Sequence, residues 1–161
     1  MVGLQVKNKG IGEKIMKIKD RKQKGNLFEY SVRDSLTQIY PNVLLTKQEG
    51  FQKQFDIWIP SAKIAIECKR HKNFTWNELE KYFLKLEKRI KANKDENDDG
   101  VYIPYLIFQG NHQPCLVMYS SQVKITDYLQ NSRTPKIIHI MKFTDYFGIP
   151  FLKHKGKKVK E

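Results

Sequence analysis

The chain has 161 residues, of which 40% are hydrophobic, so we expect one globular domain with a real core rather than a disordered chain. No apolar run reaches the roughly 18 residues of a membrane span, and the basic N-terminus lacks the apolar segment of a secretory signal. Two cysteines are too few for a disulfide scaffold. We therefore expect a cytoplasmic protein that does not enter a membrane.

The formal net charge of +13 is concentrated at the two ends of the chain. Residues 1–24 hold eight Lys or Arg against two acidic residues, and residues 153–161 hold five Lys against one. Such ends favour a polyphosphate partner, whose counterions they would displace; the alternative is that they serve only solubility. Most basic residues are Lys, which favours backbone contact over base reading. We predict a basic arm at 1–23, one domain at 24–152 and a basic tail at 153–161.

Residues 24–40 have the apolar period of a helix, because side chains three or four positions apart share one face. The expected buried stripe consists of Phe28, Val32, Leu36 and Ile39. Pro41 and Asn42 predict the end of this helix. Residues 43–47 predict a strand, which a polar loop follows.

Residues 54–70, QFDIWIPSAKIAIECKR, predict two strands joined by a tight turn. A two-residue turn at 61–62 places Asp56 directly opposite Glu67, and opposed residues share a face. Lys69 lies on that face too, one strand repeat further along. Opposed carboxylates destabilise a sheet unless a divalent cation or another positive charge compensates them. The alternative is a solvated face on which Lys69 pairs with Glu67. The expected core face consists of Phe55, Ile57, Ile59, Ile64, Ile66 and Cys68.

Thr75, with Glu78 three residues later, predicts a capped second helix that ends near Ala92. Phe74 and Trp76 are candidates for stacking on bases, with packing as the alternative for Trp76. We expect strands at 101–109, 114–120 and 135–143, a short helix within 121–130 and a helical turn at 144–148. This order predicts an α/β sheet between helices. The expected stripe of the second helix consists of Trp76, Leu79, Phe83, Leu86 and Ile90.

Glu29 lies at the border of the first helical stripe, from where a carboxylate can reach the hairpin. The segment KGNLFE at 24–29, Asp56 and the segment IECK at 66–69 together resemble the PD-(D/E)XK nuclease superfamily. Within it they look most like archaeal-type Holliday junction resolvases, over about residues 24–110. The resemblance implies a restriction-endonuclease-like α/β core: a helix, a three-stranded antiparallel meander, a second helix and further strands, in a mixed central sheet flanked by helices.

The resemblance also implies metal-dependent hydrolysis of DNA phosphodiester bonds by Glu29, Asp56, Glu67 and Lys69. Asp56, Glu67 and the backbone carbonyl of Cys68 would bind Mg²⁺ or Mn²⁺, and Glu29 would hold the ion through water or bind a second one. Lys69 would position the attacking water or stabilise charge on the phosphate. This chemistry is sound by itself, because a metal lowers the pKa of its water and an ammonium adds fixed positive charge.

We expect a Mg²⁺-dependent deoxyribonuclease that acts on branched or double-stranded DNA. A homodimer is expected, because symmetric cleavage of a four-way junction needs two sites. Residues 137–141 and 146–151 are candidates for the dimer contact or for the core. The alternatives are a restriction-like, single-strand or end-processing nuclease, and a non-catalytic DNA-binding protein of the same fold. The residues expected to contact DNA are Lys22, Lys24, Lys53, Arg70, Lys72, Lys155, Lys157 and Lys158.

Overall fold

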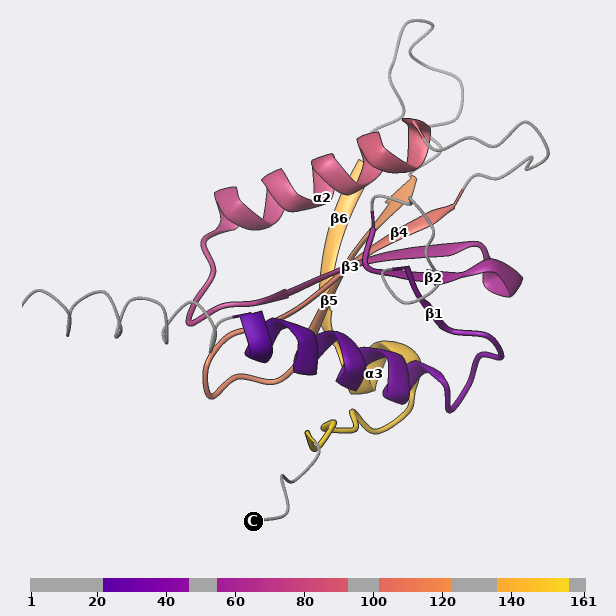
Figure 1. Cartoon of the computed structure of the whole chain (residues 1–161). Helices are drawn as coiled ribbons and strands as arrows, with labels where there is room; N and C mark the ends of the chain where they lie inside the picture. Colours follow the sequence, from indigo (N-terminus) through magenta and orange to yellow (C-terminus); the bar gives the residue numbers. More distant parts are fainter. Residues whose placement is uncertain (1–21, 47–54, 93–101, 123–135, 157–161) are drawn as a thin grey trace, which may run out of the picture.

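The computed structural model describes residues 22–46, 55–92, 102–122 and 136–156. Within these ranges six strands form one mixed sheet, in the order β1-β2-β3-β4-β5-β6. Figure 1 shows the helix at 22–36 and α3 on one face of the sheet and α2 on the other. The predicted α/β fold with a mixed central sheet between helices is confirmed, and it is consistent with a restriction-endonuclease-like core. Within the same ranges no helix is both long and apolar enough to cross a membrane.

The first helix covers residues 22–36 and ends four residues earlier than the sequence predicts. Phe28, Val32 and Leu36 are buried as expected, whereas Ile39 is 41% exposed. The chain tightens after Leu36, where the Ile39 N–H donates to the Leu36 carbonyl at 3.1 Å. An i to i+3 bond has three residues per turn rather than 3.6, so Ile39 rotates off the apolar face. The expectation for Ile39 was wrong.

The predicted antiparallel meander consists of β1 (Leu44–Leu45), β2 (Ile57–Ile59) and β3 (Ile64–Arg70). The predicted hairpin register is confirmed, since Ile57 pairs with Ile66 and Ile59 with Ile64. The turn is longer than the two residues expected: Pro60–Ala62 form a 3-10 turn, and Lys63 is left-handed with φ 52°. Proline fixes the φ with which such a turn starts. The four-residue loop leaves the pairing unchanged.

Phe55 lies on the opposite face from the one predicted. It packs beneath α2 with Ala65, Leu86 and Ile90 rather than against the helix at 22–36. The chain bends at residues 55–56, before β2 begins at Ile57, so strand alternation does not extend back to Phe55. The other five residues of the predicted core face do pack together beneath the first helix.

Helix α2 (Trp76–Ala92) begins with the predicted capping box. The Glu78 carboxylate accepts from the Thr75 N–H at 3.0 Å, and the Thr75 hydroxyl accepts from the Glu78 N–H at 3.3 Å. Leu79, Phe83, Leu86 and Ile90 are its buried residues. Trp76 is 51% exposed, so its predicted place in the stripe was wrong: it is the first helical residue, and the covered part of the helix begins one turn later.

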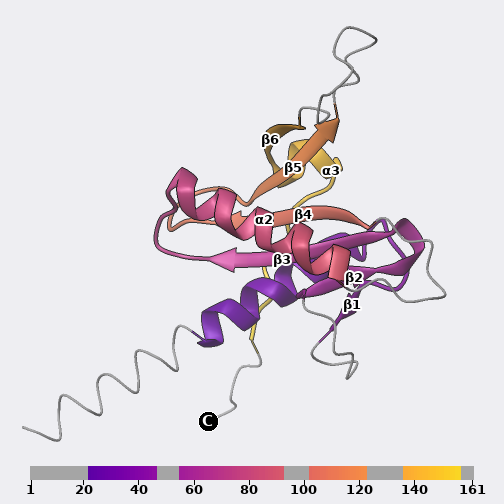
Figure 2. The ribbon, with the colours of Figure 1, turned by 90° about the horizontal axis from the view of Figure 1, so that it is seen from above.

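Helix α2 connects β3 to β4 (Ile103–Gln109), which pair in parallel along seven residues. Figure 2 shows α2 lying across these two central strands. The antiparallel strands β5 (Leu116–Gln122) and β6 (Lys136–Lys142) extend the sheet beyond β4. All three predicted strands of this half are confirmed. The short helix predicted within 121–130 is contradicted at 121–122, which belong to β5, and otherwise lies outside the described residues.

The short helix α3 (Phe143–Phe147) confirms the predicted helical turn. Phe143 is fully buried in the core that the sheet shares with the helix at 22–36. Residues 149–156, which we call the C-terminal strap, then run along the first helix. The Ser35 hydroxyl accepts from the Leu152 N–H at 2.8 Å, and the Ser31 hydroxyl accepts from the His154 N–H at 2.9 Å. The strap therefore belongs to the folded unit as far as residue 156.

Candidate active site

The candidate site lies where β3 continues past Ile57, the first residue of the antiparallel strand β2. The last paired residue of β3 on this side is Ile66, whereas pairing with β4 on the other side continues to Arg70. Among the described residues, residues 67–70 of β3 therefore have no strand paired to the main-chain edge that faces away from β4. Main-chain groups on such an edge need other partners, and the predicted site residues lie beside it.

Asp56 supplies one of these partners. Its Oδ2 accepts a hydrogen bond from the Cys68 N–H at 2.8 Å. In an extended strand the N–H and C=O of one residue point to the same side, so the Cys68 carbonyl also faces the Asp56 side of β3. The bend that places Asp56 is fixed by Thr46 at the end of β1, whose N–H donates to the Asp56 carbonyl at 3.2 Å and whose hydroxyl donates to the Phe55 carbonyl.

The electrostatics of Asp56 place it in a cluster of carboxylates. Burial, followed by the negative charges of Glu67 and Glu29, raises the pKa of Asp56 from 3.8 to about 7, against the hydrogen bond from Cys68 and the positive charge of Lys69. Glu67 on β3 and Glu29 on the first helix are thus near enough for their charges to act on Asp56. The raised pKa means that negative charge at Asp56 is not fully compensated by the protein itself.

Glu67 is only 6% exposed and lies between two cations. Its Oε1 is 3.0 Å from the Lys69 ammonium, and its Oε2 is 3.4 Å from Nη1 of Arg89 on α2. Burial would lower the pKa of Lys69, but the Glu67 carboxylate outweighs this and holds that pKa above its usual value. Lys69 therefore stays an ammonium, and it lies over the Tyr82 ring at 4.8 Å.

Sequence reasoning missed both Arg89 and Thr46. Arg89 is 22 residues from Glu67 along the chain, and the only available signal was its place in the helix next to Ile90 of the buried stripe. Thr46 follows the apolar pair of β1, and its buried side chain looks in the sequence like an ordinary strand residue. Neither has a local pattern that ties it to the hairpin.

The site suits a hard divalent cation by the chemistry of its donors. Asp56, Glu67, the Cys68 carbonyl and Glu29 offer oxygen atoms, which Mg²⁺ and Mn²⁺ prefer, and the raised pKa of Asp56 indicates a place where added positive charge is favourable. In the described ranges no three His, Cys, Asp or Glu side chains already lie close enough together to hold a metal. The carboxylate of Glu67 is engaged by Lys69 and Arg89 instead, so it must exchange these partners to bind an ion.

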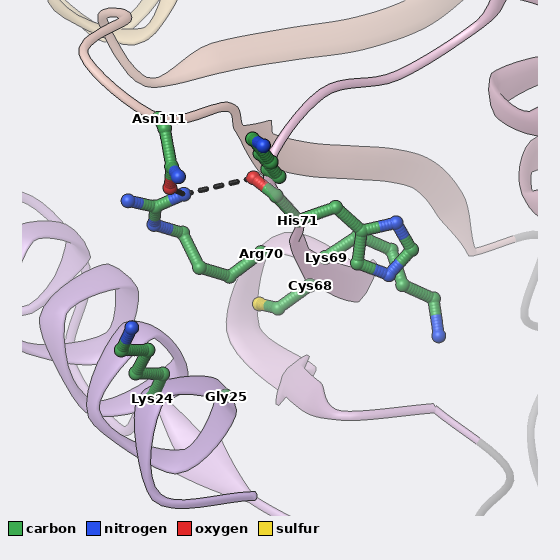
Figure 3. Close-up of a pocket in the computed structure, with 8 residues that line it drawn as sticks. Lys24, Gly25, Cys68, Lys69, Arg70, His71 and Asn111 are labelled. Carbon is green, nitrogen blue, oxygen red and sulfur yellow. Dashed lines mark hydrogen bonds between the residues drawn. The ribbon is translucent and has the colours of Figure 1, made fainter. Parts of the chain in front are cut away.

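A pocket of about 600 Å³ adjoins the site on the side of the first helix. Figure 3 shows the Arg70 side chain between Lys24 and Asn111, and the side chains of Lys69 and His71, which also line the pocket, pointing away from Arg70. Arg70 Nη1 donates to Asn111 Oδ1 at 2.9 Å and to the His71 carbonyl at 2.9 Å. Besides Cys68 and Gly25, the pocket lining consists of basic or neutral polar residues, so it is suited to an anion.

The predicted DNA contacts fall in three groups. Lys24, Arg70 and Lys72 line the 600 Å³ pocket. Lys22 in the first helix and Lys155 in the strap are exposed but line neither this pocket nor its smaller neighbour. Lys53, Lys157 and Lys158 lie outside the described residues. Of the two aromatic candidates, Phe74 packs edge-on against Phe108 at 5.2 Å, and the exposed Trp76 is available for contact.

A family model described as "Phage putative PDDEXK endonuclease" matches residues 20–151. The match includes the first helix, the hairpin and the strap as far as Phe151. No curated protein and no solved structure matches the chain significantly. The superfamily resemblance is confirmed by the family match, whereas the specific likeness to archaeal Holliday junction resolvases has no support from it.

Proposed function

The chain belongs to this PDDEXK endonuclease family, and from that premise we propose that it is a Mg²⁺- or Mn²⁺-dependent DNA endonuclease acting at the Asp56 site. The observation that supports this most directly is the bond from the Cys68 N–H to Asp56 at 2.8 Å. It draws a part-buried carboxylate onto the edge of β3 beyond its pairing with β2, beside Glu67 and Lys69. A carboxylate pair with an adjacent ammonium is suited to hydrolysing a phosphodiester with a metal ion.

In this proposal Asp56, Glu67, the Cys68 carbonyl and Glu29 would hold the cation, which when bound supplies a water of lowered pKa and positive charge at the phosphate. Lys69 remains protonated and adds a fixed positive charge where negative charge develops during attack. Asp56 has to lose its proton before it can act as a ligand. Arg89 and Lys69 keep the buried Glu67 carboxylate compensated until it changes partners.

Lys24, Arg70 and Lys72 would orient the DNA backbone in the adjoining pocket, with Lys22 and Lys155 adding weaker exposed contacts. Because these groups contact phosphate and not base edges, we propose recognition by DNA structure more than by sequence. Branched DNA such as a four-way junction is our first choice of substrate. A DNA substrate also agrees with a cytoplasmic location.

A homodimer is proposed for cleavage of two strands. Strand β6 is an outer strand of the described sheet, with Ile137 47%, Ile140 39% and Met141 38% exposed. The other candidate segment, 146–151, packs its aromatic and aliphatic side chains against the core, which leaves 137–141 for the contact. Light scattering of the wild type and of Ile140→Lys tests this: a monomeric wild type contradicts a stable dimer in solution, and a dimer that survives the substitution contradicts this contact.

The function is tested with purified protein and Mg²⁺ or Mn²⁺ on a four-way junction, a linear duplex and a single strand. We expect cleavage of the junction above the other two, and no cleavage by Asp56→Asn or Lys69→Met. Asp145→Asn, at an exposed carboxylate of α3, is the matched control and should cut like the wild type.

Each outcome decides between the alternatives. Equal cutting of all three DNAs contradicts structure selectivity and favours a general nuclease. Preference for the single strand or for duplex ends favours an end-processing enzyme. Binding without cutting by either metal favours a non-catalytic DNA-binding protein, and cutting that survives Asp56→Asn contradicts the site proposed here.

A further inference from the structure

A second pocket of about 220 Å³ lies beside the first, beyond Arg70. We call it the strap pocket, because the C-terminal strap forms one of its walls. Its cationic lining comes from Lys24, Arg70 and Lys153, and its apolar lining from Leu27, Phe28 and Phe151. Lys24 and Arg70 line both pockets, so the strap pocket continues the space that begins next to the candidate metal ligands.

The wall formed by the strap is held in place by several hydrogen bonds. Besides the bonds from Leu152 and His154 to the serines of the first helix, the Gln38 side chain donates to the Pro150 carbonyl at 3.0 Å. The His154 ring is 2.7 Å from the Asp34 carboxylate. Lys153 lies between two residues whose main-chain N–H groups are fixed, so its backbone is fixed at the rim of the pocket.

The positive charge at the rim has no carboxylate partner among the described residues. In the part of the chain that the structure describes, Lys24, Arg70 and Lys153 make no ion pair with a carboxylate. Arg70 is nevertheless held, because its Nη1 donates to three neutral oxygens, including the Gln109 carbonyl at 3.2 Å. A guanidinium fixed by neutral acceptors keeps its full charge for an external anion and loses little freedom on binding one.

The apolar side of the pocket restricts what that anion can belong to. Phe28 is buried and Phe151 packs on it with ring centroids 6.1 Å apart, so this wall suits an apolar or aromatic group, not a free inorganic ion. Proteins bind single nucleic-acid strands in this way, with cationic groups along the backbone and aromatic or apolar surfaces under the bases. A space of about 220 Å³ has room for one sugar and its base, but not for a base pair together with both of its sugars.

We infer that the strap pocket takes the sugar and base of one unpaired nucleotide, while Arg70 and Lys24 bind the phosphate that links it to the candidate metal site. The nucleotide next to the cleaved bond is therefore unpaired in the bound DNA, as at an opened branch point, in a flap or in a single strand. This inference rests on the proposed function, because it uses the Asp56 site to define where the cleaved bond lies.

The test uses DNA binding by Asp56→Asn in EDTA, so that no cleavage occurs. A splayed-arm DNA is prepared as a series in which each unpaired nucleotide next to the fork is replaced in turn by an abasic sugar. We expect one position at which the replacement weakens binding about 5- to 100-fold, as the loss of one base contact would. Methylphosphonate linkages, which remove the charge of one phosphate at a time, are then placed along the same strand. Binding should weaken at the linkage beside that position, where Arg70 and Lys24 bind the phosphate.

Protein variants locate the effect. Leu27→Trp fills the pocket and should remove the abasic effect at that one position, and Lys153→Ala should weaken binding of the splayed arm more than binding of a duplex. Lys91→Ala is the matched control, since it removes an exposed lysine at the end of α2, next to the start of β4 and at the opposite end of the sheet. If Leu27→Trp does not fold, the abasic scan with the Asp56→Asn protein still tests whether the pocket binds one nucleotide.

A scan in which all abasic positions bind alike overturns the nucleotide pocket. If Lys153→Ala and Lys91→Ala weaken binding of the splayed arm and of the duplex equally, both lysines act only by general electrostatic attraction. This result would also overturn the nucleotide pocket. The proposed function is tested separately. If the wild type never cuts DNA but binds it with a position-specific abasic effect, the nucleotide pocket is supported and the nuclease activity is rejected. If the wild type cuts DNA but all abasic DNAs bind with the same affinity, the nuclease activity is supported and the nucleotide pocket is rejected.

Discussion

Replacing Asp56 by Asn should stabilise the metal-free protein while it abolishes metal-dependent cleavage. Asp56 has its pKa raised from 3.8 to about 7 by burial and by the charges of Glu67 and Glu29. Between these values the folded protein keeps a proton that the unfolded chain has lost, so stability falls as pH rises through this range. Asn is neutral at every pH and retains an oxygen that can accept the bond from the Cys68 N–H.

The size of the effect follows from the two pKa values. One pKa unit corresponds to about 1.4 kcal/mol, so the variant should be more stable than the wild type by about 2 kcal/mol at pH 5 and about 4 kcal/mol at pH 8. These values are upper limits, because relaxation around the ionised carboxylate reduces the cost. Addition of Mg²⁺ should stabilise the wild type at pH 8, since the cation binds only the folded site, and should not stabilise the variant.

The measurement is urea unfolding in EDTA at pH 5 and pH 8, followed by the fluorescence of the two tryptophans. Asp145→Asn is the control, because it makes the same substitution at an exposed carboxylate of α3. An Asp56→Asn variant that is no more stable than the wild type at pH 8, or whose advantage is the same at both pH values, would refute the conclusion that the fold raises the pKa of this carboxyl.

Three further predictions concern the surroundings of the site. Arg89→Met should tighten Mn²⁺ binding in the absence of DNA by several-fold, measured by calorimetry, because Arg89 contacts the Glu67 carboxylate at 3.4 Å; weaker binding would mean that Arg89 orients Glu67 for the metal. Burial opposes a low pKa at Asp34, but hydrogen bonds from His154 and Arg33 outweigh it and hold the pKa of Asp34 below its usual value. Asp34→Asn should therefore cost at most about 1 kcal/mol of stability near neutral pH, with the loss disappearing as the wild type is titrated through the pKa of Asp34; an equal loss at low pH would point to packing instead. Phe143→Ala should lower the free energy of unfolding by about 3–5 kcal/mol in urea titrations, because a fully buried ring leaves a cavity, and a loss below 1 kcal/mol would contradict its place in the core.

The sequence by itself determined the features that depend on residues close along the chain. The hairpin register, the capping box of Thr75 and Glu78 and most of the two helical stripes, all but Ile39 and Trp76, follow from helical and strand periods, which act over a few residues. The register in turn placed Asp56 opposite Glu67, which made these two carboxylates candidate metal ligands, whereas Glu29 and the Cys68 carbonyl were added by the family resemblance. Their catalytic roles remain predictions.

The tertiary structure decided what depends on how distant segments meet. Sequence periodicity cannot tell where a strand bends or where a helix extends past its sheet, which is why Phe55 and Trp76 were misplaced. Nor can it pair Arg89 with Glu67, or bring the strap residue His154 to Ser31, 123 positions away in the chain. Such contacts arise from the packing of whole elements around the core, where many weak contacts together select one arrangement. The strap pocket is of this kind, because its walls come from the first helix, the ends of β3 and β4 and the C-terminal strap, and no one of these segments forms it alone.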